Sequence, residues 1–208
     1  MNLTVAELAR RAVELADSRP GRVLIAITGS PGAGKSTLAK ALAGELGARA
    51  VLVPMDGYHL SQHVLEQLGR ASRKGAPDTF DAAGLACLLG RIRAEADAPI
   101  YFPVFNRAIE EPIAAGGVVE PRHDIVLIEG NYLLLDAPAW TGLRPFFDQA
   151  WHLTVDPEVR IQRLTERHIE FGRTPAQAAD WVRTVDEPNA QLIEASSSSA
   201  DLLVTVTR

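Results

Sequence analysis

Residues 29–37 form a glycine-rich segment that matches the pattern G-x-x-x-x-G-K-[ST] at every defined position. Glycines allow a backbone to turn its N–H groups toward an anion, and a following helix adds its positive N-terminal end. A lysine can contact the β- and γ-phosphates, and a serine hydroxyl can ligate Mg²⁺. The segment predicts a nucleoside triphosphate site formed by Gly29, Ser30, Pro31, Gly32, Ala33, Gly34, Lys35, Ser36 and Thr37.

Two acidic residues end or nearly end apolar runs. Asp56 ends the run 50–56, and Glu129 lies at the end of the run 124–130. Asp56 fits a group that accepts the proton of an acceptor hydroxyl in phosphoryl transfer. Glu129 is the alternative base, or a group that organises Mg²⁺ together with Ser36. A turn aspartate before Gly57 and a solvated acid at a strand end remain the structural alternatives.

Arginines follow the spacing of one helix face at 160, 163 and 167, and Gly172-Arg173-Thr174-Pro175 then breaks the helix. Such a segment, about 160–190, is a candidate lid. Closing it would place Arg163, Arg167 and Arg173 on the transferring phosphoryl group and would exclude water. A solvated basic helix face is the alternative interpretation.

The remaining residues with metal or redox chemistry give little signal. The five histidines have no metal-site spacing; His59 is expected near the acceptor and His168 on the lid surface. The single cysteine, Cys87, excludes a disulfide framework and a cysteine zinc site. It lies in an apolar run, so we expect it to be buried.

These side chains must be positioned by alternating strands and helices. Apolar runs predict strands at 22–28, 50–56, 124–130, 150–156 and 201–207, and amphipathic patterns predict helices at about 3–16, at 35–46 and from Pro157 onward. This alternation predicts an α/β fold of three layers with a five-stranded parallel sheet covered on both faces. The glycine-rich motif at 29–37, between the first of these strands and a helix, makes the P-loop NTPase fold the expected one. In such sheets the ligand lies beyond the carboxyl ends of the strands.

The segment of about 57–122 is long for one connection. It contains predicted helices at 60–68 and 82–94 and two short candidate strands near 101–105 and 117–120. Its own core would be too small for an independent domain. We therefore expect one domain, 1–208, with an insertion on the acceptor side.

Composition narrows the class of protein. The chain has 208 residues, a net charge of −5, 47% hydrophobic and 23% charged residues, and only 3 lysines. We expect no nucleic-acid partner and no membrane span, and a cytoplasmic location. No N-K-x-D segment occurs, and Asp81-Ala82-Ala83-Gly84 is expected to open a helix, which argues against a GTPase. A kinase remains favoured; a nucleotide-dependent regulatory or binding module is the alternative.

Four segments together resemble the P-loop kinases of the uridine kinase, phosphoribulokinase and bacterial pantothenate kinase group. They are 29–37, Pro54-Met55-Asp56-Gly57-Tyr58-His59, 73–81, and Leu127-Ile128-Glu129-Gly130-Asn131-Tyr132-Leu133-Leu134. Within that group the chain is most similar to short bacterial kinases associated with fructose transport and to nucleoside kinases. The resemblance implies ATP- and Mg²⁺-dependent transfer to a hydroxyl of a small acceptor such as a sugar, a nucleoside or a pantothenate-like compound.

The resemblance also implies roles for individual residues. Asp56 matches the acceptor-activating aspartate, and Lys35 and Ser36 match the phosphate and metal positions. Relatives often carry an acid where this chain has Asn106, and this departure leaves the identity of the acceptor open between an acidic or phosphorylated compound and a neutral polyol. The expected acceptor pocket, besides Asp56, consists of Tyr58, His59, Arg73, Lys74, Tyr101, Asn106 and Arg107. Since relatives are often dimers or larger, a homodimer is expected.

Overall fold

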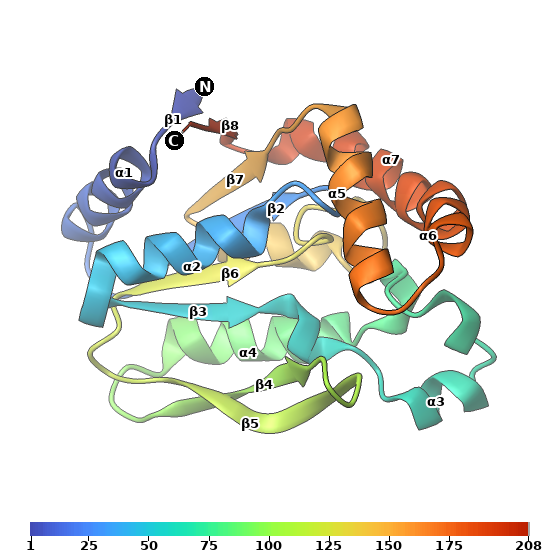
Figure 1. Ribbon diagram of the computed structural model, residues 1–208. Helices are drawn as coiled ribbons and strands as arrows, with labels where there is room; N and C mark the ends of the chain where they lie inside the picture. The colour runs from blue at the N-terminus through green and yellow to red at the C-terminus, as the bar shows by residue number, and fades with distance from the viewer. Residues whose placement is uncertain (208) are drawn as a thin grey trace.

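The computed structural model describes residues 1–207 and is built on a sheet of six parallel strands (Figure 1). In sheet order these are β1 (Asn2–Leu3), β8 (Leu202–Val206), β7 (Gln149–Leu153), β2 (Val23–Gly29), β6 (Ile125–Glu129) and β3 (Ala50–Pro54). The α/β fold with a parallel sheet is as predicted. The count of five strands was wrong, because the two-residue edge strand β1 is too short to leave a periodic pattern.

Strand β2 lies in the middle of the sheet and is buried along its whole length. It pairs with β6 along one edge and with β7 along the other, and helices cover both faces of the sheet. A strand in that position is apolar at every residue rather than at alternate ones. Its last residue, Gly29, therefore delivers the glycine-rich turn at the centre of the carboxyl edge.

Helices cover the two faces of the sheet separately. Helices α1 (Val5–Asp17) and α2 (Lys35–Leu46) pack on one face with Ile25 and Ile27 of β2. Helix α4 (Ala82–Ala94) packs on the other with Leu24 and Ala26. The predicted helix at 3–16 begins later than expected. Thr4 caps it through a capping box with Glu7, which leaves Leu3 free for β1.

The long connection after β3 contains a short helix, helix α4 and an antiparallel ribbon, as the sequence predicted in outline. Helix α3 spans Gln62–Gln67, and the ribbon consists of β4 (Ile100–Asn106) and β5 (Glu111–Val119). The second strand is longer than predicted. Residues 113–116 on it are small or exposed, so they give no buried-strand pattern.

The segment after β7 folds into three helices beyond the carboxyl ends of the strands (Figure 1). They are α5 (Pro157–Glu170), α6 (Pro175–Trp181) and α7 (Glu187–Ala195), with a π-helical turn at 182–186. Asp156 caps α5, and Thr174 with Gln177 forms a capping box for α6. Gly172, at φ 93°, makes the turn between them, where the sequence predicted the break.

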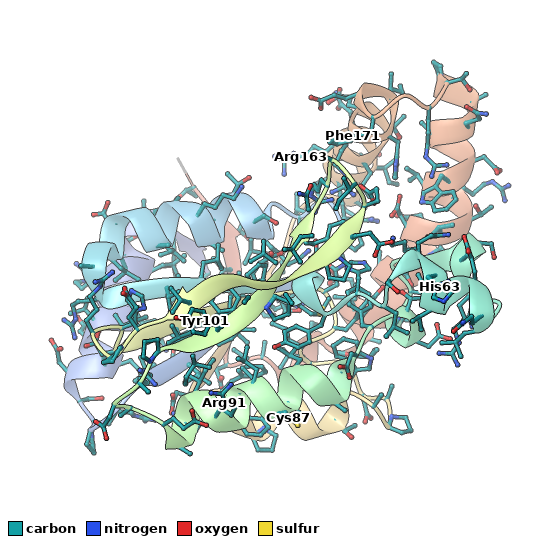
Figure 2. The ribbon with its side chains drawn as sticks, turned by 90° about the horizontal axis from the view of Figure 1, so that it is seen from below. His63, Cys87, Arg91, Tyr101, Arg163 and Phe171 are labelled. Carbon is teal, nitrogen blue, oxygen red and sulfur yellow. The ribbon has the colours of Figure 1, made fainter. Side chains whose placement is uncertain are left out.

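Two further features bear on the sequence analysis. Cys87 is exposed on the outer side of α4, so the expectation that it is buried was wrong (Figure 2). The helical spacing there places Leu85, Leu88 and Leu89 inward and leaves Cys87 outward. Within residues 1–207, no helix combines the length and the apolar character that a membrane crossing needs.

Candidate functional site

The glycine-rich turn lies between β2 and α2, and its conformation excludes larger residues. Gly32 has a φ of 81°, and a Cβ on it would lie 2.9 Å from Cγ of Leu164 in α5. A Cβ on Gly29 would lie 2.7 Å from the carbonyl oxygen of Leu153 in β7. The turn is thus pressed against both neighbours, with Gly34 at φ 95° preceding the first residue of α2. Its backbone N–H groups and the helix N-terminus suit an anion.

Lys35 is the buried cation of this turn. Its side chain is 6% exposed, and its Nζ donates a hydrogen bond to the carbonyl of Ser30 over 3.0 Å. Burial lowers the pKa of Lys35, while the carboxylates of Glu129 and Asp56 act in the opposite direction. The ammonium group is therefore held at the turn by one backbone hydrogen bond and lies in the field of two acids, neither of which forms an ion pair with it among the described residues. A triphosphate can replace part of that interaction.

A cavity of about 1160 Å³ opens in front of the turn. Its lining includes residues 31–37, Asp56 and Glu129, and Arg163, Arg167 and Arg173 of the candidate lid. It lies at the carboxyl edge of the sheet, where the parallel topology places ligands. The structure thus brings the expected phosphate-binding, acidic and arginine groups to one space.

Glu129 is the last residue of β6 and is 9% exposed. Burial raises its pKa, and the neighbouring Asp56 raises it further, whereas Lys35 and a hydrogen bond with Ser36 lower it. One carboxylate beside one hydroxyl is an oxygen donor set that suits Mg²⁺ when phosphates and waters complete the shell. Within residues 1–207, no cluster of three or more His, Cys, Asp or Glu side chains forms a separate metal site.

Asp56 was predicted to end a strand. It lies instead in a 3-10 turn directly after β3. Its carbonyl contacts Nδ1 of His59 at 2.8 Å, and its Oδ2 lies 3.0 Å from Nη2 of Arg107. His59 in turn packs between Phe80 and Phe105, with ring centroids 4.0 and 4.7 Å away. The turn places the Asp56 carboxylate in the cavity, between the phosphate-binding turn and the ribbon.

The arginines of the candidate lid fall into two groups, those that line the cavity and one that is buried at the base of α5. Arg163 and Arg167 of α5 line the cavity, as does Arg173, whose Cζ lies 3.8 Å above the ring centroid of Trp181. Figure 2 shows Arg163 near the end of the ribbon that lies toward α5. Arg160 is instead buried at the base of α5. There it pairs with Glu187 of α7 and packs against Gly32. Its Nη1 has no hydrogen-bond partner.

Comparison with known proteins shows the family. A family model described as "AAA domain" matches residues 25–174. A crystal structure from Silicibacter sp. TM1040, of a "putative fructose transport system kinase", is 39% identical with a TM-score of 0.89. It covers 97% of this chain and 99% of that one. A "putative uridine kinase" of Schizosaccharomyces pombe is 34% identical over 95% of this chain and 88% of its own length.

The chain belongs to the P-loop kinases. A uridine kinase of Clostridium botulinum is also 33% identical to it, over 88% of this chain and 87% of its own length. This P-loop kinase is therefore a phosphotransferase that binds a nucleotide and acts on a small-molecule acceptor. The family resemblance inferred from the four sequence segments is confirmed.

Four residues expected in the acceptor pocket of the kinase lie outside the cavity. Tyr58 is buried in the core under α4. Arg73 is exposed and pairs with Asp78, with 2.6 Å between Nη2 and Oδ2. Tyr101 is 61% exposed, and Figure 2 shows it on the ribbon far from Arg163. The Asn106 side chain accepts a hydrogen bond from the N–H of Ala108 and shapes the hairpin turn.

Other lining residues were not predicted. Tyr132 follows β6. It is fully buried and forms part of the cavity wall. His168, expected on the lid surface, is mostly buried and contacts Oδ2 of Asp186 at 2.8 Å. The sequence did not predict the place of Tyr132 because the segment after Glu129 forms no regular element. It did not predict the burial of His168 because the π-helical turn that carries its partner Asp186 breaks the helical period. The sequence segment Asn131-Tyr132 directly after the strand was the available signal for Tyr132.

The sequence also did not predict a set of hydrogen bonds that supports the phosphate-binding turn. Ser30 is fully buried, and its Oγ donates a hydrogen bond to Oε1 of Glu194 over 2.5 Å. The other oxygen of Glu194 lies 3.3 Å from Nε2 of His152 in β7. Burial lowers the pKa of His152, so its neutral ring donates to the carboxylate. Helix α7 is thereby tied to the turn that holds Lys35.

Proposed function

We propose that this kinase transfers the γ-phosphoryl group of ATP to a hydroxyl group of a small acceptor, in a reaction that requires Mg²⁺. One observation carries the proposal: the phosphate-binding turn and the Asp56 carboxylate line the same cavity. The γ-phosphate end of a triphosphate on residues 31–37 would face the acid across that space. A sugar or a nucleoside is the acceptor class that the names of the relatives suggest.

The residues of the chain would share the chemistry as follows. Lys35 and the backbone N–H groups of the turn would bind the β- and γ-phosphates. Ser36 and Glu129 would hold Mg²⁺, which supplies charge neutralisation on the phosphate oxygens when bound. Asp56 would orient the acceptor hydroxyl and accept its proton. Positioning and electrostatic stabilisation supply most of the rate enhancement in phosphoryl transfer, so base catalysis is a smaller share.

The segment of about 160–190 would act as the lid in this reaction. Arg163, Arg167 and Arg173 already line the cavity, where they can stabilise charge that develops on the transferring group. Closure over the nucleotide would exclude water and so suppress hydrolysis of ATP. Residues of about 57–122 would form the acceptor side of a single domain, and two copies of the chain would form a homodimer.

An ADP-release assay with a panel of hydroxyl acceptors tests the proposal. Sugars, nucleosides, hydroxy acids and their phosphorylated forms are each added to enzyme, ATP and Mg²⁺. Release of ADP that depends on one acceptor, and a phosphorylated product, supports the kinase mechanism. Slow hydrolysis that no acceptor stimulates, and that a protein partner accelerates, would favour a nucleotide-dependent regulatory module instead.

A further inference from the structure

Within residues 1–207, two cationic side chains beside Asp56 have only one carboxylate partner between them. Lys74 and Arg107 both line the cavity and both lie over the ring of Phe105. Nζ of Lys74 is 5.6 Å from the ring centroid, and Cζ of Arg107 is 6.0 Å from it. They come from segments 33 positions apart, yet one aromatic ring holds both. The arrangement concentrates positive charge on one side of Asp56.

The two cations differ in the charge of their hydrogen-bond partners. Arg107 pairs with Asp56, whereas Lys74 donates only to the backbone carbonyl of Glu110, over 2.6 Å. Among the described side chains, no carboxylate forms an ion pair with Lys74. Glu110 also lines the cavity, but within the described residues its carboxylate forms no ion pair with either cation. His59, which also lines the cavity, has its pKa lowered by burial, by Lys74 and by Arg107, so it adds no stable positive charge.

The loop that carries Lys74 is fixed rather than loose. The carbonyl of Gly75 accepts a hydrogen bond from Oη of Tyr132 over 2.6 Å, and the Gly75 N–H donates to Oγ1 of Thr79 over 2.9 Å. Tyr132 and Thr79 are both fully buried. The neighbouring Arg73 turns outward to Asp78, so the loop directs one cation to the cavity and the other to solvent. Lys74 is therefore positioned before any ligand arrives.

Positive charge is already present elsewhere for the nucleotide. Lys35 lies in the turn, and Arg163, Arg167 and Arg173 extend from the lid. Lys35 and the turn face the part of the cavity where the phosphates of ATP are proposed to bind. Arg167 lies within electrostatic reach of Lys35, Asp56 and Arg107, so it can act on the phosphates and on the acceptor side. Lys74 and Arg107 lie beside Asp56 and the ribbon, over the ring of Phe105, where the acceptor is proposed to bind.

We propose that the acceptor of this kinase carries an anionic group, a carboxylate or a phosphate, which Lys74 and Arg107 bind. The inference rests on the proposed function and specifies its substrate class. Arg107 can donate to that anion through Nη2, the atom that now contacts Asp56. Binding of the acceptor anion therefore draws Arg107 from Asp56 and leaves the carboxylate free to accept the proton of the acceptor hydroxyl.

Matched pairs of acceptors test the inference. Glycerate is compared with glycerol, pantothenate with its alcohol, and ribose 5-phosphate with ribose, in the ADP-release assay. We expect the anionic member of a pair to have the higher kcat/KM, by roughly 10- to 100-fold, the range for a hydrogen bond to a charged group. The pairs also distinguish a carboxylate from a phosphate.

The assay distinguishes failure of the anionic-acceptor inference from failure of the proposed kinase function. Turnover of a neutral member equal to or faster than that of its anionic counterpart would overturn the anionic class and leave the kinase mechanism standing. Turnover of no acceptor in either class would contradict the proposed function, and the inference would fall with it.

A variant supplies the second test. Lys74→Met keeps the length of the side chain and removes its charge. We expect a 10- to 100-fold higher KM for the anionic acceptor, an unchanged KM for ATP, and a smaller defect in Lys74→Arg. Lys40→Met, on the exposed face of α2, is the matched control and keeps the parent KM values. An unchanged acceptor KM in folded Lys74→Met would contradict the inference; if that variant does not fold, the acceptor pairs decide on the parent enzyme.

Discussion

Nη2 of Arg107 lies 3.0 Å from Oδ2 of Asp56, so the acid in the cavity is paired before any acceptor is bound. Both side chains are partly exposed, at 59% for Arg107 and 31% for Asp56. Exposed ion pairs contribute little to stability, about 0–1 kcal/mol. The contact can therefore be exchanged for a contact with substrate at small cost. A fixed, deeply buried pair at the same place would have obstructed the chemistry.

Asp56→Asn should separate catalysis from nucleotide binding. An amide keeps the shape of the side chain but cannot accept a proton, so we expect turnover to fall by roughly 10²- to 10⁴-fold. ATP affinity, measured by calorimetry, should stay near the parent value because the phosphate-binding turn is untouched. Unchanged turnover would transfer the role of the base to Glu129.

Lys35→Met should weaken nucleotide binding. The ammonium group would otherwise donate charge-assisted hydrogen bonds to phosphate oxygens, so its loss should raise the Kd for ATP by roughly 10- to 100-fold. Lys40→Met, five residues along the same helix, removes an equal charge at the surface and serves as the control. Equal ATP affinity in both variants would refute the assignment of the phosphate site.

The pH dependence of nucleotide binding should report Glu129. Burial raises the pKa of this carboxyl group, so it becomes protonated at a higher pH than an ordinary glutamate. Only the ionised form can hold Mg²⁺, and it is lost as the pH falls through the raised pKa. We expect the KM for Mg²⁺-ATP to increase as the pH falls through this raised pKa. In Glu129→Gln the KM should be high and flat, and an acid limb that persists there would assign it to another group.

Glu194 should act as a positioning residue for the phosphate-binding turn. Glu194→Ala removes the short hydrogen bond of the buried Oγ of Ser30 and leaves it only the long contact with the carbonyl of Ala190, 3.4 Å away, at a cost of about 1–3 kcal/mol. We expect the KM for ATP to rise about 10-fold while the KM for the acceptor is unchanged; Glu194→Gln, which still accepts the hydrogen bond, should recover most of the loss. Glu45→Ala, on the exposed surface of α2, is the control. A general loss of thermal stability with no change in the KM for ATP would leave Glu194 a purely structural role.

Local sequence patterns predicted the parts of the site that depend on neighbouring residues. The segment 29–37 specifies a turn by its own glycines, and Lys35–Leu46 and Ala82–Ala94 form helices with the predicted bounds. Asp81 caps the second of these by accepting a hydrogen bond from the N–H of Gly84, as the argument against a GTPase required.

What the sequence left open depends on contacts between distant segments. Whether Arg73 or Lys74 faces the cavity is decided by Asp78 on one side and Tyr132 on the other. Arg160 shares the helical spacing of Arg163 and Arg167, but Glu187, 27 positions later, pairs with it at the base of α5. Residue type and periodicity contain no information on such partners, so Tyr58, Arg73, Tyr101 and Asn106 were placed in the pocket by position alone.

The three-helix segment after β7 is attached to the phosphate-binding turn at both of its ends. Its first turns press Arg160 and Leu164 against Gly32, and its last turn holds Ser30 through Glu194. The pairing of Arg160 with Glu187 then ties the two ends to each other. Any movement of this segment must bend near its middle, around Gly172 and the π-helical turn, while its base stays still. The arginines nearest that bend would travel furthest, and those nearest the base would scarcely be displaced.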